Sequence, residues 1–163
     1  MADIRSYIEY FRMIAAEHKE INGFYMMDIN EILDGLRSTV KYPALILENL
    51  SGSYMASNLD NPLEVINGGF LIIDHLKNPD DFPGEVVIID RMKQIGQQVI
   101  SRMLHDKMMC EILAEKAIPG FDLNTVTFEV VGPVFDNDCG VLYSFKITNL
   151  IDFEYNPIDW TPN

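Results

Sequence analysis

The chain has 163 residues, enough for one domain with a sizeable core, and its 25 Asp and Glu against 12 Lys and Arg give a formal net charge of −13. Proteins hold nucleic acid largely by neutralising phosphates with cations, so this charge argues against specific nucleic-acid binding and against attraction to anionic membranes. Two cysteines without a CxxC spacing, and no apolar run near the ~18 residues of a membrane span, predict a soluble cytoplasmic protein with reduced thiols.

The first segment has the apolar spacing of an amphipathic helix. Its apolar residues recur every three or four positions and share one helix face: Ile4, Tyr7, Ile8, Phe11, Ile14 and Ala15. Asp3 can cap the start and Asn22-Gly23 can stop the helix, which predicts a helix over residues 3–21. A capping-box pattern at Asp28-Ile29-Asn30-Glu31 predicts a second, short helix.

Two strand-like runs follow, at residues 44–50 and 64–77. Pro43 lacks an amide donor, so it belongs at a strand start or on a sheet edge. Ser51-Gly52-Ser53 predicts a bulge or bend. Gly68-Gly69 lies inside the second run and predicts a bulge or a close approach of other backbone, because glycines weaken a regular strand.

A second amphipathic helix begins near Pro83 or Gly84, where proline suits a first helical turn. Its predicted buried stripe is Ile88, Met92, Ile95, Val99 and Met103, with Leu104 as a further candidate. The helix either runs unbroken to Ala117 or stops near His105 and restarts. Pro119-Gly120 ends it in both cases.

The last two strand-like runs lie at residues 123–131 and 139–150, with a hairpin loop between them. In the first run Val126, Phe128 and Val130 alternate with Thr125, Thr127 and Glu129, which predicts a half-buried strand. The order helix–hairpin–helix–hairpin predicts an α+β fold. We expect a two-layer sandwich, with an antiparallel sheet of about four strands packed by two main helices. Residues 1–151 are expected to form this single domain, and residues 152–163 a C-terminal aromatic and acidic tail.

No motif indicates catalytic chemistry. The three histidines are far apart in sequence and fit no paired-ligand spacing: His18, His75 and His105. We therefore expect no catalytic residue, no cofactor and no metal site, and we predict that the protein is not an enzyme. The least favoured alternative is a small metal-dependent hydrolase that uses scattered acids such as Asp74 and Asp81.

Two groups of side chains are candidates for an interface. The C-terminal tail combines Phe153, Tyr155 and Trp160 with two prolines and three acids. Aromatic anchors of this kind either pack on their own domain or dock on a neighbouring subunit. Met108 and Met109, in a methionine-rich helical segment, serve either as core filler or as an adaptable interface.

The order of elements, over nearly the whole chain, resembles the tail-terminator and tail-completion proteins of long-tailed phages. Three segments resemble small prophage-encoded tail-region proteins: Gly69-Phe70-Leu71-Ile72-Ile73-Asp74-His75, Gly120-Phe121-Asp122-Leu123 and Tyr155-Asn156-Pro157-Ile158-Asp159-Trp160. The resemblance implies a small structural subunit that assembles with copies of itself into a ring and with other tail or head–tail proteins, ending in a virion or phage-like particle. A cytosolic protein-binding adaptor is the alternative.

Overall fold

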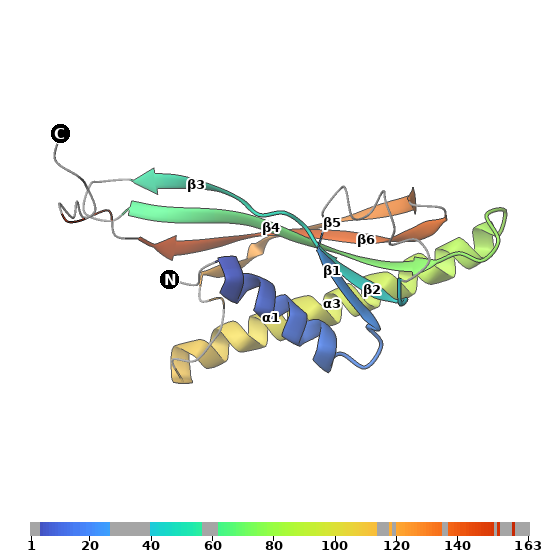
Figure 1. The fold of residues 1–163 in the computed structure, drawn as a ribbon, viewed down its shortest axis with the longest axis horizontal. Helices are drawn as coiled ribbons and strands as arrows, with labels where there is room; N and C mark the ends of the chain where they lie inside the picture. Colours follow the sequence, from blue (N-terminus) through green and yellow to red (C-terminus); the bar gives the residue numbers. More distant parts are fainter. Residues whose placement is uncertain are drawn as a thin grey trace.

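The computed structural model of the protein describes residues 4–26, 40–56, 62–113, 118, 120–134, 137–151, 153 and 158. This part of the chain forms two helices, α1 (Ile4–Glu17) and α3 (Phe82–Leu113), and six strands (Figure 1). The strands are β1 (Gly23–Met26), β2 (Ala44–Leu47), β3 (Ser51–Ala56), β4 (Pro62–His75), β5 (Phe121–Val134) and β6 (Asp138–Leu150). The short helix predicted from residues 28–31 falls outside the described residues.

All six strands belong to one mixed sheet. β1, β2, β4, β6 and β5 lie side by side in that order, and β3 also pairs with β4. The central strand β4 pairs with β2 through its residues 70–73 and with β3 through its residues 62–67. β1 and β2 are parallel, and the other pairs are antiparallel. The predicted antiparallel sheet of about four strands is therefore wrong, whereas the α+β class with two main helices is confirmed.

The sequence pattern did not predict β1 and β3, which depend on pairing with neighbouring strands and show no apolar period of their own. β1 is four residues long, and the Asn22 N–H before it donates to the Pro43 carbonyl at 2.8 Å, which sets the parallel register with β2. β3 has only exposed residues and pairs with β4 alone among the described strands. Between β2 and β3, the three residues 48–50 stand opposite Gly68 and Gly69. The predicted bulge therefore lies just before Ser51, opposite the glycine pair.

Both helices pack on the same face of the sheet (Figure 1). The core between them includes a cluster of aromatic rings among aliphatic side chains. The Phe11 ring of α1 stacks on Phe145 of β6 at 5.9 Å between centroids, and Phe70 of β4 stacks on Tyr143 at 5.2 Å. Of the predicted stripe of α3, Met92, Ile95, Val99 and Met103 are buried, whereas Ile88 and Leu104 are half-buried. In α1, Ile4 is exposed, so the buried face begins at Tyr7.

The opposite face of the sheet, here called the open face, has a smaller apolar cluster: Ala44, Ile46, Leu71 and Ile73. Successive residues of a strand point to opposite faces, so β2 and β4 contribute side chains both to the core under the helices and to the open-face cluster. The sheet is thus buried on both sides around β2 and the last half of β4. Toward the β3 end, the burial of β4 falls from full to partial.

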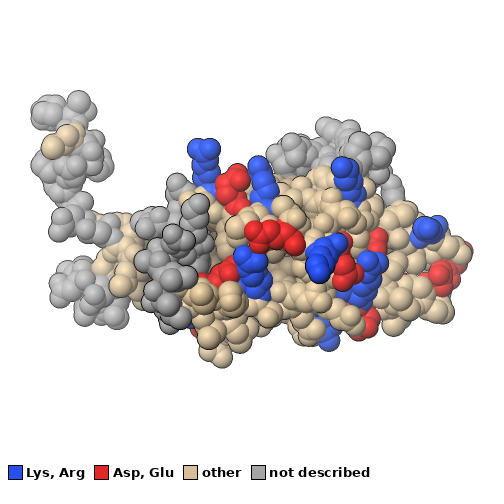
Figure 2. Space-filling view, turned by 90° about the horizontal axis from the view of Figure 1, so that it is seen from below, with Lys and Arg blue, Asp and Glu red and all other residues tan. Residues whose placement is uncertain are grey.

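The helix-covered face carries closely mixed charges, with basic and acidic side chains interspersed (Figure 2). Arg102 of α3 contacts Glu17 at 2.9 Å and Asp106 at 2.8 Å, and Arg91 contacts Glu20 at 3.1 Å. The Glu17 and Glu20 pairs connect the end of α1 and the residues after it to α3, although each exposed pair contributes little free energy. Neither described helix contains an apolar stretch long enough to cross a membrane.

Candidate functional site

One end of the sheet extends beyond both helices (Figure 1). We call this part the arm; it consists of β3, residues 62–65 of β4 and residues 148–150 of β6, joined by the β3–β4 and β4–β6 registers. Every residue of β3 is exposed, and residues 62–65 of β4 are only half-buried. Because no described helix covers it, the arm presents both of its faces to solvent.

Large apolar side chains lie on both faces of the arm. On the open face, Met55, Leu63 and Leu150 are register partners across three strands, and Leu150 keeps 72% of its surface exposed. On the other face, the Tyr54 ring is 63% exposed and meets Phe153 edge-on, with ring centroids 5.0 Å apart. The arm is therefore an apolar surface without a described covering layer.

The predicted interface residues are only partly placed. Phe153 contacts Tyr54 of its own chain, yet 58% of its surface stays exposed, so it is available to a partner as well. Met108 and Met109 are exposed on α3, whereas Met103 of the same segment is core. Tyr155 and Trp160 lie outside the described residues.

Sequence reasoning missed Tyr54, Met55 and Leu150. The signal that could have found them is the composition of β3, Ser-Gly-Ser-Tyr-Met-Ala, which has no charged residue although 23% of the chain is charged. Exposed strands usually carry charges that discourage pairing with other chains. An uncharged exposed strand therefore indicates an interface.

A second uncovered apolar region lies on β5. Phe128 and Val130 belong to the apolar side of the predicted half-buried strand, but both are exposed, at 54% and 53%. They are opposite Tyr143 and Val141 of β6 and therefore face the helix side. From α3, the Lys93 ammonium lies over the Phe128 ring, 4.8 Å from the ring centroid. β5 is thus an edge strand whose helix side is only partly covered.

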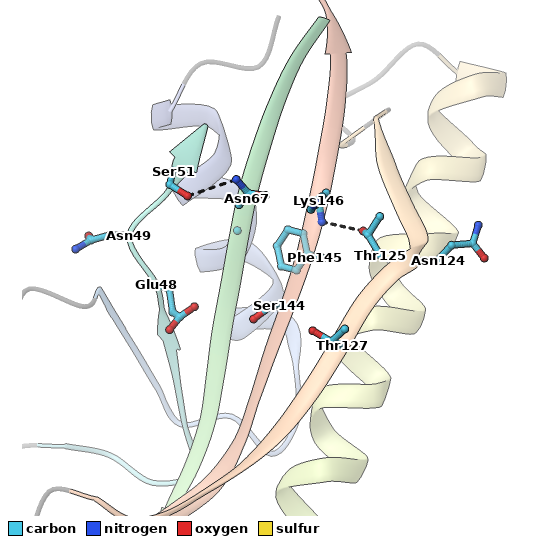
Figure 3. Close-up of a pocket in the computed structure, with 11 residues that line it drawn as sticks. Glu48, Asn49, Ser51, Asn67, Asn124, Thr125, Thr127, Ser144, Phe145 and Lys146 are labelled. Atoms are coloured by element: carbon cyan, nitrogen blue, oxygen red, sulfur yellow. Dashed lines mark hydrogen bonds between the residues drawn. The ribbon is translucent and has the colours of Figure 1, made fainter. Parts of the chain in front are cut away.

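The open face contains a shallow polar hollow of about 530 Å³ near the base of the arm (Figure 3). Glu48 and Ser51 lie on one side of β4, Thr125 and Thr127 lie across the hollow on β5, and Lys146 of β6 lies between them. The Lys146 backbone N–H donates to Thr125 Oγ1 at 2.9 Å. The lining is mainly hydroxyl and amide groups, with one carboxylate and one ammonium. It offers hydrogen bonds but no paired nucleophile and base.

The glycine pair of β4 makes room for two polar side chains next to this hollow. A Cβ at Gly68 would lie 2.3 Å from the Tyr7 hydroxyl, and a Cβ at Gly69 would lie 2.3 Å from a Glu48 carboxylate oxygen. Burial raises the pKa of Glu48. Burial also raises the pKa of Tyr7, with a smaller contribution from Glu48. The Tyr7 hydroxyl is buried and has no hydrogen-bond partner among the residues that the structure describes, which is a free-energy cost in the fold.

Replacing Tyr7 by Phe is therefore expected to leave the free energy of unfolding unchanged or to raise it by about 1 kcal/mol, because the substitution removes an unpaired buried hydroxyl. The matched control is Tyr10→Phe on the same helix, where the hydroxyl donates to Asp106 at 3.0 Å. That variant is expected to lose about 1.5 kcal/mol, since hydrogen bonds to charged groups are the stronger ones. Urea unfolding of both variants measures the difference. An equal loss in both would show that Tyr7 is hydrogen-bonded.

The most buried charged group of the described residues is Asp138, at the start of β6. Its carboxylate accepts a hydrogen bond from the Tyr42 hydroxyl at 2.6 Å and contacts His75 Nδ1 at 2.9 Å. His75 faces Asp138 through the β4–β6 register, so its imidazole ring meets a carboxylate from across the sheet, whereas its backbone N–H donates to Asp74 Oδ1 at 2.8 Å. Burial and the Asp138 hydrogen bond raise the pKa of Tyr42. This cluster fixes the segment before β2 to the far ends of β4 and β6.

The acids of the hydrolase alternative are occupied separately. Asp74 lies 3.8 Å from Arg91, and Asp81 Oδ1 accepts the Gly84 N–H at the start of α3 at 3.0 Å. Burial raises the pKa of the Cys139 thiol to about 11, with Glu85 and then Asp74 adding to the effect, so this buried thiol is protonated at neutral pH. Within the described residues, no group of three or more His, Cys, Asp or Glu is arranged to hold a metal ion.

Comparisons of the chain with protein-family models, with curated proteins and with solved structures find no match. Function therefore has to be inferred from the surfaces themselves. Those surfaces are an uncovered apolar arm, an apolar edge strand on the other side of the sheet, and a polar hollow between them.

Proposed function

We propose that the protein is a structural subunit of a phage or prophage tail, of the terminator or completion type, which assembles with copies of itself into a ring and binds other tail or head–tail proteins. The observation that carries this proposal is the arm, where Tyr54, Met55, Leu150 and Phe153 are more than half exposed on a part of the sheet without a helix layer. The resemblance in element order supports the tail assignment.

The physical argument concerns the cost of leaving such a surface in water. Burial of apolar surface is worth roughly 25 cal/mol per Å². Contiguous exposed apolar patches on a soluble chain typically mark protein–protein contacts. Aromatic residues and methionine are enriched in such contacts, and the arm presents both types. When the arm packs on another protein, its apolar side chains leave water, and this burial stabilises the complex relative to the isolated chain.

The polar hollow and the Asp138 cluster fit a structural role. The hollow is open and hydroxyl-lined, and the Asp138 carboxylate is engaged by Tyr42 and His75. The Asp138 cluster joins β6 to the end of β4, and the Lys146–Thr125 hydrogen bond beside the hollow joins β6 to β5. Among the described residues that line the hollow, no nucleophile is paired with a base, and the Asp138 carboxylate is buried, so geometric fit to partners is the better supported mode of action.

Sedimentation of the full chain over a wide concentration range tests the proposal. The expected result is a defined species of several times 18.6 kDa. The measurement should be made at physiological or higher salt, because a net charge of −13 opposes association when it is unscreened. A monomer at every concentration and salt would contradict the ring. A dimer or monomer that binds a single different protein would support the adaptor alternative instead.

A further inference from the structure

Among the described strands the sheet has three free edges, and two of them, β3 and β5, lie on opposite sides. β3 lies beyond β4, and the outer side of β3 pairs with no described strand. β5 lies beyond β6 and ends the sheet on the other side. β5 pairs regularly with β6 over residues 127–131, with register shifts before and after this stretch. The remaining free edge, β1, has only four residues and is mostly half-buried.

The strand directions at these two edges are suited to each other. β3 is antiparallel to β4, β4 to β6, and β6 to β5. β3 and β5 therefore run in opposite directions within one chain. If a second copy is placed beside the first in the same orientation, its β3 meets the first copy's β5 as an antiparallel pair, with the helices of both copies on the same side.

The side chains of the two edges also match by face. On the helix side, Tyr54 of β3 would meet Phe128 and Val130 of β5, all of them exposed in the single chain. On the open face, Ser53 would meet Thr127 and Glu129, both of which are exposed. The only charged group across residues 51–56 and 127–131 is Glu129. The pair therefore puts apolar next to apolar and polar next to polar, with no like charges opposed.

We propose that β3 of one copy pairs antiparallel with residues 127–131 of β5 in the next copy, so that a continuous sheet runs through the assembly. The inference rests on the proposed function, because it specifies which surfaces join the copies. The contact is heterologous: each copy uses its β3 on one side and its β5 on the other, and such contacts build a closed ring or a filament.

Cross-linking between engineered cysteines tests the pairing. In a Cys110→Ser background, Ser53→Cys and Thr127→Cys would be combined in one chain and treated with a short bismaleimide that tolerates a shift of one or two residues in register. The double variant is expected to give a ladder of covalent multimers. Each single variant alone is expected to give none, and a mixture of the two single variants is expected to stop at dimers.

The matched control combines Ser53→Cys with Ser101→Cys, an exposed position on α3. This control should give no ladder. If sedimentation shows that the protein is oligomeric but the double variant gives no stronger ladder than the control, the edge pairing is overturned and the proposed function stands. Efficient cross-linking of a single variant to itself would also overturn it, since that indicates a two-fold contact. A strictly monomeric protein would overturn both proposals.

Discussion

Introducing a carboxylate on the β3 edge, with Ser53→Glu, is expected to weaken self-association about 10- to 100-fold. The new charge would face Glu129 of the next copy on the open face, and like charges opposed across an interface cost up to several kcal/mol, where 1.4 kcal/mol corresponds to a factor of ten. Ser53 is exposed, so the fold itself should be unaffected. Sedimentation equilibrium measures the change in association constant.

The design includes its own rescue. Glu129→Lys in the same chain reverses the opposing charge and is expected to restore association to near the original level, with the restored part weakening as salt rises. Ser101→Glu adds the same charge on α3 and is expected to have little effect beyond the general repulsion. If Ser53→Glu and Ser101→Glu weaken association equally, β3 is not at the interface.

Replacing Phe11 with Ala is expected to lower the free energy of unfolding by about 3–5 kcal/mol, the range for truncating a buried phenylalanine. Phe11 is fully buried and contacts rings from three elements: Tyr7 of α1, Phe70 of β4 and Phe145 of β6. The loss would come from both the lost apolar burial and the cavity left between α1 and the sheet. Urea unfolding monitored by circular dichroism measures it.

The matched control is Ile4→Ala on the same helix. Ile4 is 67% exposed, so the same kind of truncation is expected to cost less than about 0.5 kcal/mol. A loss of similar size in both variants would mean that α1 does not pack on the sheet through the Phe11 face.

The elements that could be predicted from the sequence are those with a long apolar period. α1 and α3 show one buried side every three or four residues, and the β5–β6 hairpin shows alternation, so their existence followed from pattern alone. β1 could not be predicted in this way, because a four-residue strand has no measurable period and depends on pairing with residues 21 positions away. β3 is uncharged and exposed, and only its pairing with β4 makes it a strand.

The same distinction holds for the candidate surfaces. The sequence identified Phe153, Met108 and Met109 as candidates for either packing or an interface, and the structure places all three at the surface. The exposure of Phe128 could not be read from its alternation, because that depends on how far α3 extends across the sheet. The Asp138–His75 contact depends on cross-strand register, which alternation does not fix.

The register of the sheet sets the geometry of a closed assembly. Ser53 of β3 pairs with Val65, which pairs with Thr148 of β6. Glu129 of β5 pairs with Leu142 of β6. The middles of the two edges are therefore about six residues, or roughly 20 Å, apart along the strands. Each copy adds four strands across, roughly 19 Å. For the copies to stay at one height, the strands have to lean about 45° from the ring axis, close to the slant that barrels adopt. Such a wall would carry the helices on one side and the hydroxyls and amides around Asn67 and Ser144 on the other.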